Sequence, residues 1–364
     1  MPGRISRAAV ASASSLVLTV FRHRLGRLAL RLEGHYRPLY LREAALATPA
    51  IPLLTAAGYL AGAPAVGAIA AGAAFAVGFG AARDLKGRRW AAMIVATLGM
   101  PIATFVGAVT GLGSPGLIAA AAVLAVVCAV TDLVDDDLWW LALQMIVALM
   151  LAGAVPGDAI HAAGIAAIVL LGGGVQLMLV FCLARTFPNA GLPLPKPPAQ
   201  TPPSPGDLAA HAFRAVLAVV TSLWLVGAAH LQNGYWAPMI AMIILRPGLR
   251  QTRVRGLARV VGTVAGGLAA AAAIHFVGLS ASTILLGVGL ATVGAYGLQK
   301  AHYSTLTAFI TMVVVLLACV AHPLVAANAE HRLLATLIGG GCALGSAALF
   351  PRRIPGAEPA ASGG

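Results

Sequence analysis

Charged side chains are scarce in this sequence. Asp, Glu, Lys and Arg make up 10% of its 364 residues, whereas hydrophobic residues make up 60%. A soluble domain carries about 25% charged residues, so the composition excludes a water-soluble fold and predicts an all-α polytopic membrane protein. Acidic residues are scarcest, because 11 Asp and Glu stand against 24 Lys and Arg. In a membrane protein this excess holds loops in the cytoplasm, and we expect no nucleic-acid partner.

Cysteines and catalytic motifs are also few. The four cysteines lie in apolar runs, without the spacing of a metal site, and we expect them to be reduced packing residues. No zinc, phosphate-loop or dinucleotide motif is present. The sequence therefore predicts no metal, no cofactor and no enzymatic activity.

Apolar runs that can cross a ~30 Å hydrocarbon layer predict about twelve transmembrane helices. They lie near 46–62, 64–82, 90–110, 115–131, 138–156, 160–184, 211–231, 234–246, 256–277, 281–298, 303–321 and 332–350. The expected layout is a basic amphipathic arm (1–45), a six-helix half (46–187), a Pro-rich cytoplasmic linker (188–210), a second six-helix half (211–350) and a polar tail (351–364).

The two halves repeat at a distance of 167 positions. Gly172 to Gly174 fall on Gly339 to Gly341 (339 − 172 = 167), and Pro156 falls on Pro323. Each half has an even number of spans, so the repeat is expected to be parallel, with its axis along the membrane normal.

Basic residues predict the orientation. With both termini in the cytoplasm of a bacterial inner membrane, of the 24 Lys and Arg only Arg332 lies on the outer face. The basic arm is then expected to lie on the anionic inner leaflet, with a cleaved signal peptide as the alternative.

The strongest concentration of charge lies in 235–263, where an apolar helix runs into five arginines. Arg246, Arg253, Arg255 and Arg259 are predicted to bind an anionic substrate near the start of a helix expected at Gly256, because guanidinium groups pair with carboxylates. The alternative is that such arginines only set the topology.

Other groups are candidates for the same substrate path. Arg83 and Arg88 are predicted to serve the first half, and Tyr235 and Trp236 to stack an aromatic substrate or to lie in an interfacial belt. Two further features are expected to be structural: Trp139 and Trp140 as belt residues, and 132–137 as a solvated acidic loop.

Proton coupling has few candidates, since no Asp, Glu or Lys falls in the middle of any expected span. Asp132 is the plausible carboxylate, and His275 and His302 are the candidate histidines. This scarcity favours a passive anion channel or uniporter as the alternative to a proton-driven transporter.

The segment 235–263 resembles the signature of the fusaric acid resistance (FUSC) family of bacterial inner-membrane proteins. The matching positions are Tyr235, Trp236, Ala237, Pro238, Arg246, Pro247, Thr252, Arg255, Gly256, Arg259, Gly262 and Thr263. The resemblance implies efflux of small organic anions, aromatic carboxylic acids in particular, driven by the proton gradient. The chain departs from the family pattern at Gly248, where an acidic residue is frequent, and in lacking a soluble cytoplasmic domain.

Two further possibilities stay open. One is a membrane scaffold without transport activity. The other is a homo-oligomer formed through the GxxxG pairs Gly58/Gly62, Gly262/Gly266 and Gly341/Gly345.

Overall fold

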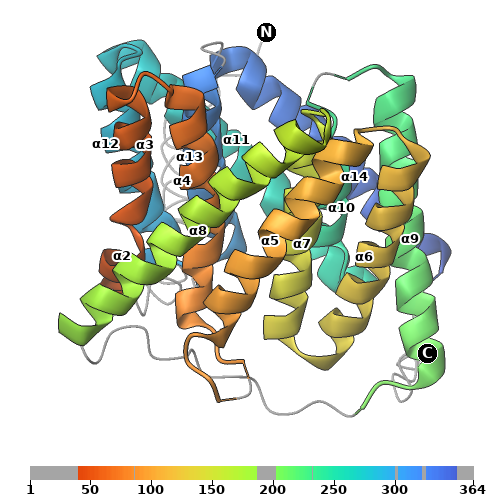
Figure 1. Ribbon diagram of the computed structural model, residues 1–364. Helices are drawn as coiled ribbons and strands as arrows, with labels where there is room; N and C mark the ends of the chain where they lie inside the picture. Colours follow the sequence, from red (N-terminus) through yellow and green to blue (C-terminus); the bar gives the residue numbers. More distant parts are fainter. Residues whose placement is uncertain are drawn as a thin grey trace, which may run out of the picture.

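The computed structural model describes residues 40–85, 87–186, 202–231, 233–299, 302–321 and 325–350. Within these ranges the regular elements are helices, apart from one isolated bridge between Leu85 and Arg88 (Figure 1). Most of the basic arm, the Pro-rich part of the linker and the polar tail lie outside the described residues.

Thirteen α-helices and one 3-10 turn follow one another along the described chain. The first half contains α2 (Leu41–Ala47), α3 (Ala50–Leu60), α4 (Pro64–Gly78), η1 (Phe79–Ala82), α5 (Ala91–Thr110), α6 (Pro115–Val134), α7 (Asp136–Gly153) and α8 (Ala159–Thr186). The second contains α9 (Pro205–Ala228), α10 (Trp236–Ile244), α11 (Leu249–Val277), α12 (Ala281–Gly297), α13 (Tyr303–Ala321) and α14 (Val325–Leu349).

Nine of the described helical segments are long and apolar enough to cross a membrane. Each of the twelve expected spans coincides with a helix, but α3, α10 and α12 have only 11, 9 and 17 residues. Large apolar side chains such as Leu60, Ile102 and Phe276 point outward and are 90%, 68% and 82% exposed. The prediction of an all-helical, multi-pass membrane protein is therefore confirmed at this level.

Three helices begin six or seven residues earlier than expected, and α14 is one of them, because it begins at Val325 rather than at 332. α9 begins at Pro205 rather than at 211, because Ser204 caps its N-terminus and proline is favourable in the first turn. α11 begins at Leu249 rather than near Gly256, so the expectation of an arginine-rich loop was wrong there. The side chain of Thr252 accepts a hydrogen bond from the Arg246 amide (3.1 Å) and stabilises the tight turn that joins α10 to α11.

Small residues bring the helix backbones together. A methyl group added at Gly172 would overlap the carbonyl oxygen of Ala70, and one added at Gly339 would overlap that of Ala237. Lipid is as apolar as the side chains, so close packing of this kind is a main source of helix association in membranes. The contacts join α8 to α4 and α14 to α10.

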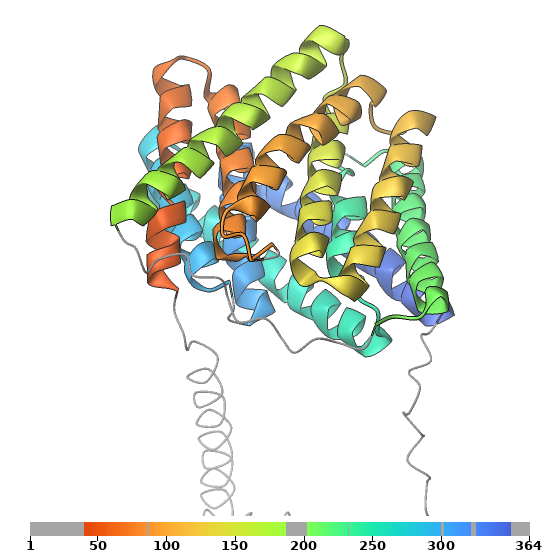
Figure 2. The ribbon, with the colours of Figure 1, turned by 60° about the horizontal axis from the view of Figure 1, so that its bottom comes forward.

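Packing joins helices within each half and also between the two halves. α5 packs on α7 and α8, and α11 packs on α13 and α14. Between the halves, α6 packs on α9, α12 on α3, α7 on α10 and α4 on α13. The long helix α8 crosses the other helices of its half obliquely (Figures 1 and 2). α7, α10, α11 and α13 bring the candidate site residues together.

Candidate functional site

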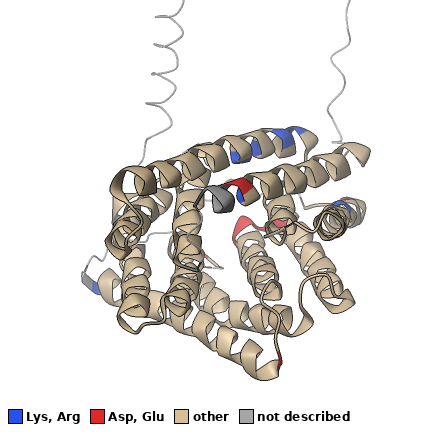
Figure 3. Ribbon diagram, turned by 90° about the horizontal axis from the view of Figure 1, so that it is seen from above, with Lys and Arg blue, Asp and Glu red and all other residues tan. Residues whose placement is uncertain are grey.

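Two arginines of α11 point into the bundle. Arg259 is 4% exposed and Arg255 is partly buried, whereas Arg250 and Arg253 are exposed. Residues four apart share one helix face, so Arg255 and Arg259 lie together and Arg253 points away from them. In Figure 3 several of the basic bands are gathered toward one end of one long helix.

Arg246, directly after α10, forms an ion pair with the first half of the chain. Its Nη1 donates to Oδ1 of Asp132 at the end of α6, and it lies 3.6 Å from the exposed carboxylate of Asp136. The other carboxylate oxygen of Asp132 lies 3.1 Å from Nε2 of His211 on α9. The Asp132 side chain is only 2% exposed. The expectation of a solvated loop at 132–137 was therefore wrong at this residue, because tertiary contacts bury it.

Aromatic rings separate the buried arginines. The guanidinium of Arg246 lies 3.8 Å from the centre of the Trp139 ring, and that of Arg255 lies 5.4 Å from the same ring. Arg255 also lies 4.3 Å from the Tyr303 ring, and Arg259 donates to the Tyr303 hydroxyl at 3.5 Å. We call these five residues the arginine ladder. Cation–π contacts reach about 2 kcal/mol where they are desolvated, and they hold the guanidinium groups without neutralising them.

The ladder carries more positive than negative charge. Its three guanidinium groups face one buried carboxylate, Asp132, at the Arg246 end. Arg255 donates from Nε to the carbonyl oxygen of Ile243 (2.7 Å), in the last turn of α10, where the helix dipole favours a cation. Within the described residues, Nε of Arg259 is buried without a hydrogen-bond partner. The arrangement has the chemistry of an anion-binding site.

Arg83 lies beside the ladder and belongs to the first half. It donates to Oδ1 of Asp137 (3.0 Å) and to the backbone oxygen of Asp136 (3.2 Å), and it lies 5.0 Å from the Trp140 ring. Burial lowers the pKa of Arg83, while the carboxylates of Asp137 and Asp136 raise it. The nearby charge of Arg246 lowers it further. The N-terminal turn of α7 therefore holds arginines from both halves.

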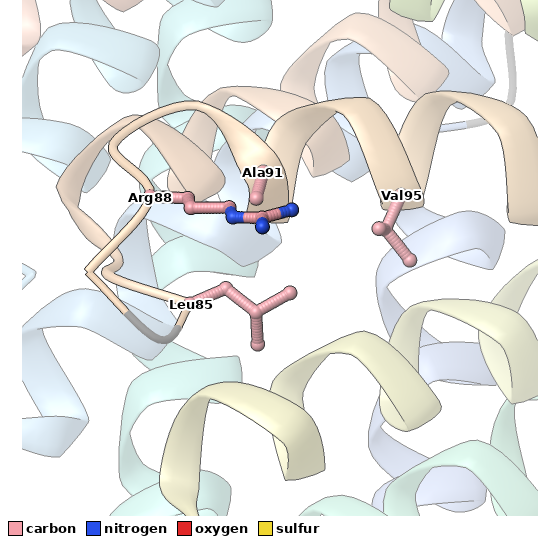
Figure 4. A pocket seen from close by; sticks show the side chains of 4 residues that line it. All are labelled: Leu85, Arg88, Ala91 and Val95. Atoms are coloured by element: carbon pink, nitrogen blue, oxygen red, sulfur yellow. The ribbon is translucent and has the colours of Figure 1, made fainter.

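Arg88 lies apart from this cluster. It is exposed and lines an open pocket of about 410 Å³ together with Leu85, Ala91 and Val95 (Figure 4). The other three lining residues are apolar, so this pocket supplies a single charged group. The structure does not bring Arg88 into contact with the ladder.

The remaining predicted residues lie elsewhere. Tyr235 and Trp236 lie at the start of α10, with ring centres 5.3 Å apart, and the guanidinium of Arg332 lies 4.0 Å over Trp236. His275 is exposed beside Phe276, and His302 is exposed and lies 2.6 Å from the Ser304 hydroxyl. Of the proton-coupling candidates, only Asp132 is part of the cluster around the ladder.

The sequence did not single out several residues that build the site. Trp139 and Trp140 are 6% and 4% exposed, so their expected place in an interfacial belt was wrong: they lie beneath guanidinium groups. His211 and Tyr303 were missed because their partners are distant in sequence. Arg214 is also buried, and its Nη1 donates to the carbonyl oxygen of Pro247 (3.0 Å), which holds the turn after α10. The run of acidic residues directly before two tryptophans was the available signal for an arginine-binding surface.

Long apolar helices, outward-facing aliphatic side chains and an internal arginine cluster define a multi-pass membrane protein with positive charge in its interior. Residues 217–345 match the family model described as "Fusaric acid resistance protein-like", so this part of the chain is similar to that family. The predicted resemblance is thereby confirmed, and it points to a role in membrane transport or efflux. No curated protein and no solved structure matches the chain.

Proposed function

We propose that the protein exports small organic anions, aromatic carboxylic acids in particular, across the bacterial inner membrane, driven by the proton gradient. The observation that carries this proposal is the arginine ladder, in which three guanidinium groups share two aromatic rings inside an apolar bundle. Guanidinium groups bind carboxylates, and the ring faces offer stacking surfaces to an aromatic acid.

The arrangement of the ladder suits passage of an anion better than tight binding of one. Its arginines lie at successive levels of one path, from Arg246 at the end of α10 to Arg259 in the third turn of α11. Conduction requires sites that are attractive enough to admit an anion and weak enough to release it. Part of the charge at the entrance is neutralised by Asp132, which moderates binding there.

We also propose the twelve-span, two-repeat architecture. Its support is that equivalent helix ends lie 167 residues apart: α5 ends at Thr110 and α11 at Val277 (277 − 110 = 167), and α7 begins at Asp136 and α13 at Tyr303 (303 − 136 = 167). The close pairs Gly172–Ala70 and Gly339–Ala237 are related by the same shift.

The two halves differ at the position of Arg246. Its counterpart under the shift is Phe79 (246 − 167 = 79), which packs on Tyr296 with ring centres 4.8 Å apart. Tyr296 is 1% exposed and donates to the carbonyl oxygen of Phe75 (2.8 Å). Aromatic packing thus fills the position in one half where the other has a charged cluster. We therefore propose a single substrate path, through the second half.

The coupling mechanism has one candidate pair. The side chains of Asp132 and His211 are both buried and contact one another, and Asp132 pairs with Arg246, the first arginine of the ladder. Proton transfer to Asp132 would free Arg246 to bind substrate, which favours coupled export. The alternative, a passive anion channel or uniporter, is favoured by the interior of the ladder, where no described carboxylate pairs with Arg255 or Arg259.

We place both termini and the Arg246 end of the ladder in the cytoplasm, following the distribution of basic residues. A homo-oligomer would use Gly341 and Gly345, because no other part of the described chain lies against them. Gly262 and Gly266 already pack on α13, and Gly58 packs on Gly67.

The test is uptake of labelled benzoate into proteoliposomes that contain the purified protein. Arg255→Ala and Arg259→Ala are expected to reduce transport by more than about tenfold, because each removes a charged hydrogen-bond donor from the path. Arg250→Ala and Arg253→Ala, on the exposed face of the same helix, are the matched controls and should transport normally.

Three results distinguish the exporter, channel and scaffold hypotheses. Transport that ceases when a protonophore collapses an imposed pH gradient supports coupled export. Transport that follows the benzoate gradient without a pH gradient supports the channel. If the wild-type protein transports benzoate under neither condition, the scaffold hypothesis is supported. If Arg255→Ala and Arg259→Ala both transport as well as the controls, the substrate-binding roles assigned to Arg255 and Arg259 are wrong.

A further inference from the structure

Arg332 is a cation inside an apolar span, outside the ladder. It belongs to the span Glu330–Leu349 of α14 and is only 3% exposed. The sequence had placed it on the outer face, yet its guanidinium lies 4.0 Å over the Trp236 ring. Within the described ranges its Nε and Nη1 atoms are buried and have no hydrogen-bond partner.

These unmade hydrogen bonds are unfavourable in a membrane. Lipid tails accept no hydrogen bond, and the face of an indole ring is a weak substitute for an acceptor. A buried guanidinium with unmade hydrogen bonds is therefore expected where a ligand supplies the acceptor during function. None of the ion pairs among the described residues includes Arg332. Glu330, two residues before it, is exposed. The folded chain therefore holds a buried donor pair that an acceptor ligand can satisfy.

Arg259 approaches the same region from α11. α11 packs along α14, and Arg259 and Arg332 are both buried, with 4% and 3% of their surfaces exposed. Among the described residues, Nε of Arg259 and Oγ1 of Thr263, one turn further along α11, are also buried without partners. Two like charges held close together in a medium of low dielectric are stabilised by an anion placed between them.

We propose that Arg332, Arg259 and Trp236 form a second binding site, for the carboxylate of a small aromatic acid, deeper in the membrane than Arg246. The nine residues of α10 separate Trp236 from the Arg246 end by about 13 Å, at 1.5 Å per residue. The site rests on the proposed function, because Arg259 belongs to both and gives the anion a continuous series of guanidinium groups. Tyr235 lies beside Trp236 and adds a second ring to the site.

The test measures binding separately from transport. The full-length protein is purified in uncharged detergent, which excludes lipid phosphates, and benzoate binding is measured by calorimetry. Arg332→Met removes the charge and keeps an unbranched side chain that can pack on Trp236. We expect it to weaken benzoate binding by about tenfold or more, with unchanged or higher thermal stability. Arg253→Met, an exposed arginine of α11, is the control and should bind as wild type.

The outcomes separate this site from the proposed function. Normal benzoate binding by Arg332→Met, with lowered thermal stability, overturns the site, because a cation that only packs against Trp236 behaves so. Chloride binding that benzoate does not displace also overturns the carboxylate assignment. If benzoate binding depends on Arg332 but the wild-type protein transports no benzoate, the site stands and the proposed function fails.

Discussion

The contact between Asp132 and Arg246 leads to the most specific prediction, because its two members are unequally buried. The Asp132 side chain is 2% exposed and that of Arg246 is 13% exposed. Removing one member of a buried pair costs about 3–5 kcal/mol, since the other charge is left without compensation. After Arg246→Gln, His211 is the side-chain partner that Asp132 retains among the described residues, so we expect the free energy of unfolding to fall by about 3 kcal/mol or more.

Substituting Asp132 instead of Arg246 should lower the free energy of unfolding by less. After Asp132→Asn, Arg246 can still turn toward the exposed carboxylate of Asp136, 3.6 Å away, and still lies on Trp139. We therefore expect Asp132→Asn to lower the free energy of unfolding by about 1–2 kcal/mol. The double variant Asp132→Asn with Arg246→Gln leaves neither charge unpaired. Its loss should lie close to that of Asp132→Asn alone, well below the sum of the two single losses.

The assay is denaturant unfolding of the purified protein in mixed micelles, with the free energy of unfolding compared across the four members of the cycle. Arg253→Gln, which removes an exposed arginine, is the control for a general effect of lost charge. Additive losses, with the double variant equal to the sum of the singles, would refute the reasoning, because they would show that Asp132 and Arg246 are not energetically coupled.

Three further predictions concern packing and the ladder. Gly339→Ala should lower stability by about 1–3 kcal/mol, because its methyl group would overlap a carbonyl oxygen of α10, whereas Gly341→Ala, with open space around it, should not; thermal unfolding compares them. Arg255→Lys keeps the charge but loses the planar group that stacks on aromatic rings, so benzoate transport should fall severalfold; unchanged transport would contradict the stacking role. Tyr296→Phe breaks the hydrogen bond to Phe75 and should cost about 1 kcal/mol of stability without changing transport, and a transport defect would place the path in the first half as well.

Much of the fold could be predicted because lipid constrains composition directly. A span must be apolar over nearly its whole length, and prolines and basic residues collect between spans, so helix positions follow from the chain alone. The prediction was wrong at the start of α11, where the residues before Gly256 were expected to form an arginine-rich loop. Arginine is a good helix former, and burial of Arg259 against Tyr303 holds that charge inside the bundle.

The site was predictable only in part. Arg246, Arg255 and Arg259 stood out because fixed charge is rare in so apolar a chain, and because they lie in the segment that resembles the family signature. Their contacts could not be predicted, although Asp132 was a candidate for proton coupling, because Asp132 and Trp139 lie more than a hundred positions earlier. An acidic run before two tryptophans also describes an ordinary membrane interface.

The sequence by itself thus determined the class of protein, the approximate helices, the similarity of residues 217–345 to a known family and the excess of positive charge, since each of these follows from composition or local pattern. Tertiary structure decided which charges are neutralised. It paired Arg246 with Asp132, placed Arg259 on the Tyr303 hydroxyl, and buried Arg332 over Trp236. The physical reason is that the energy of a charge in a membrane depends on the groups within a few ångströms of it, and those groups come from helices far apart in the chain.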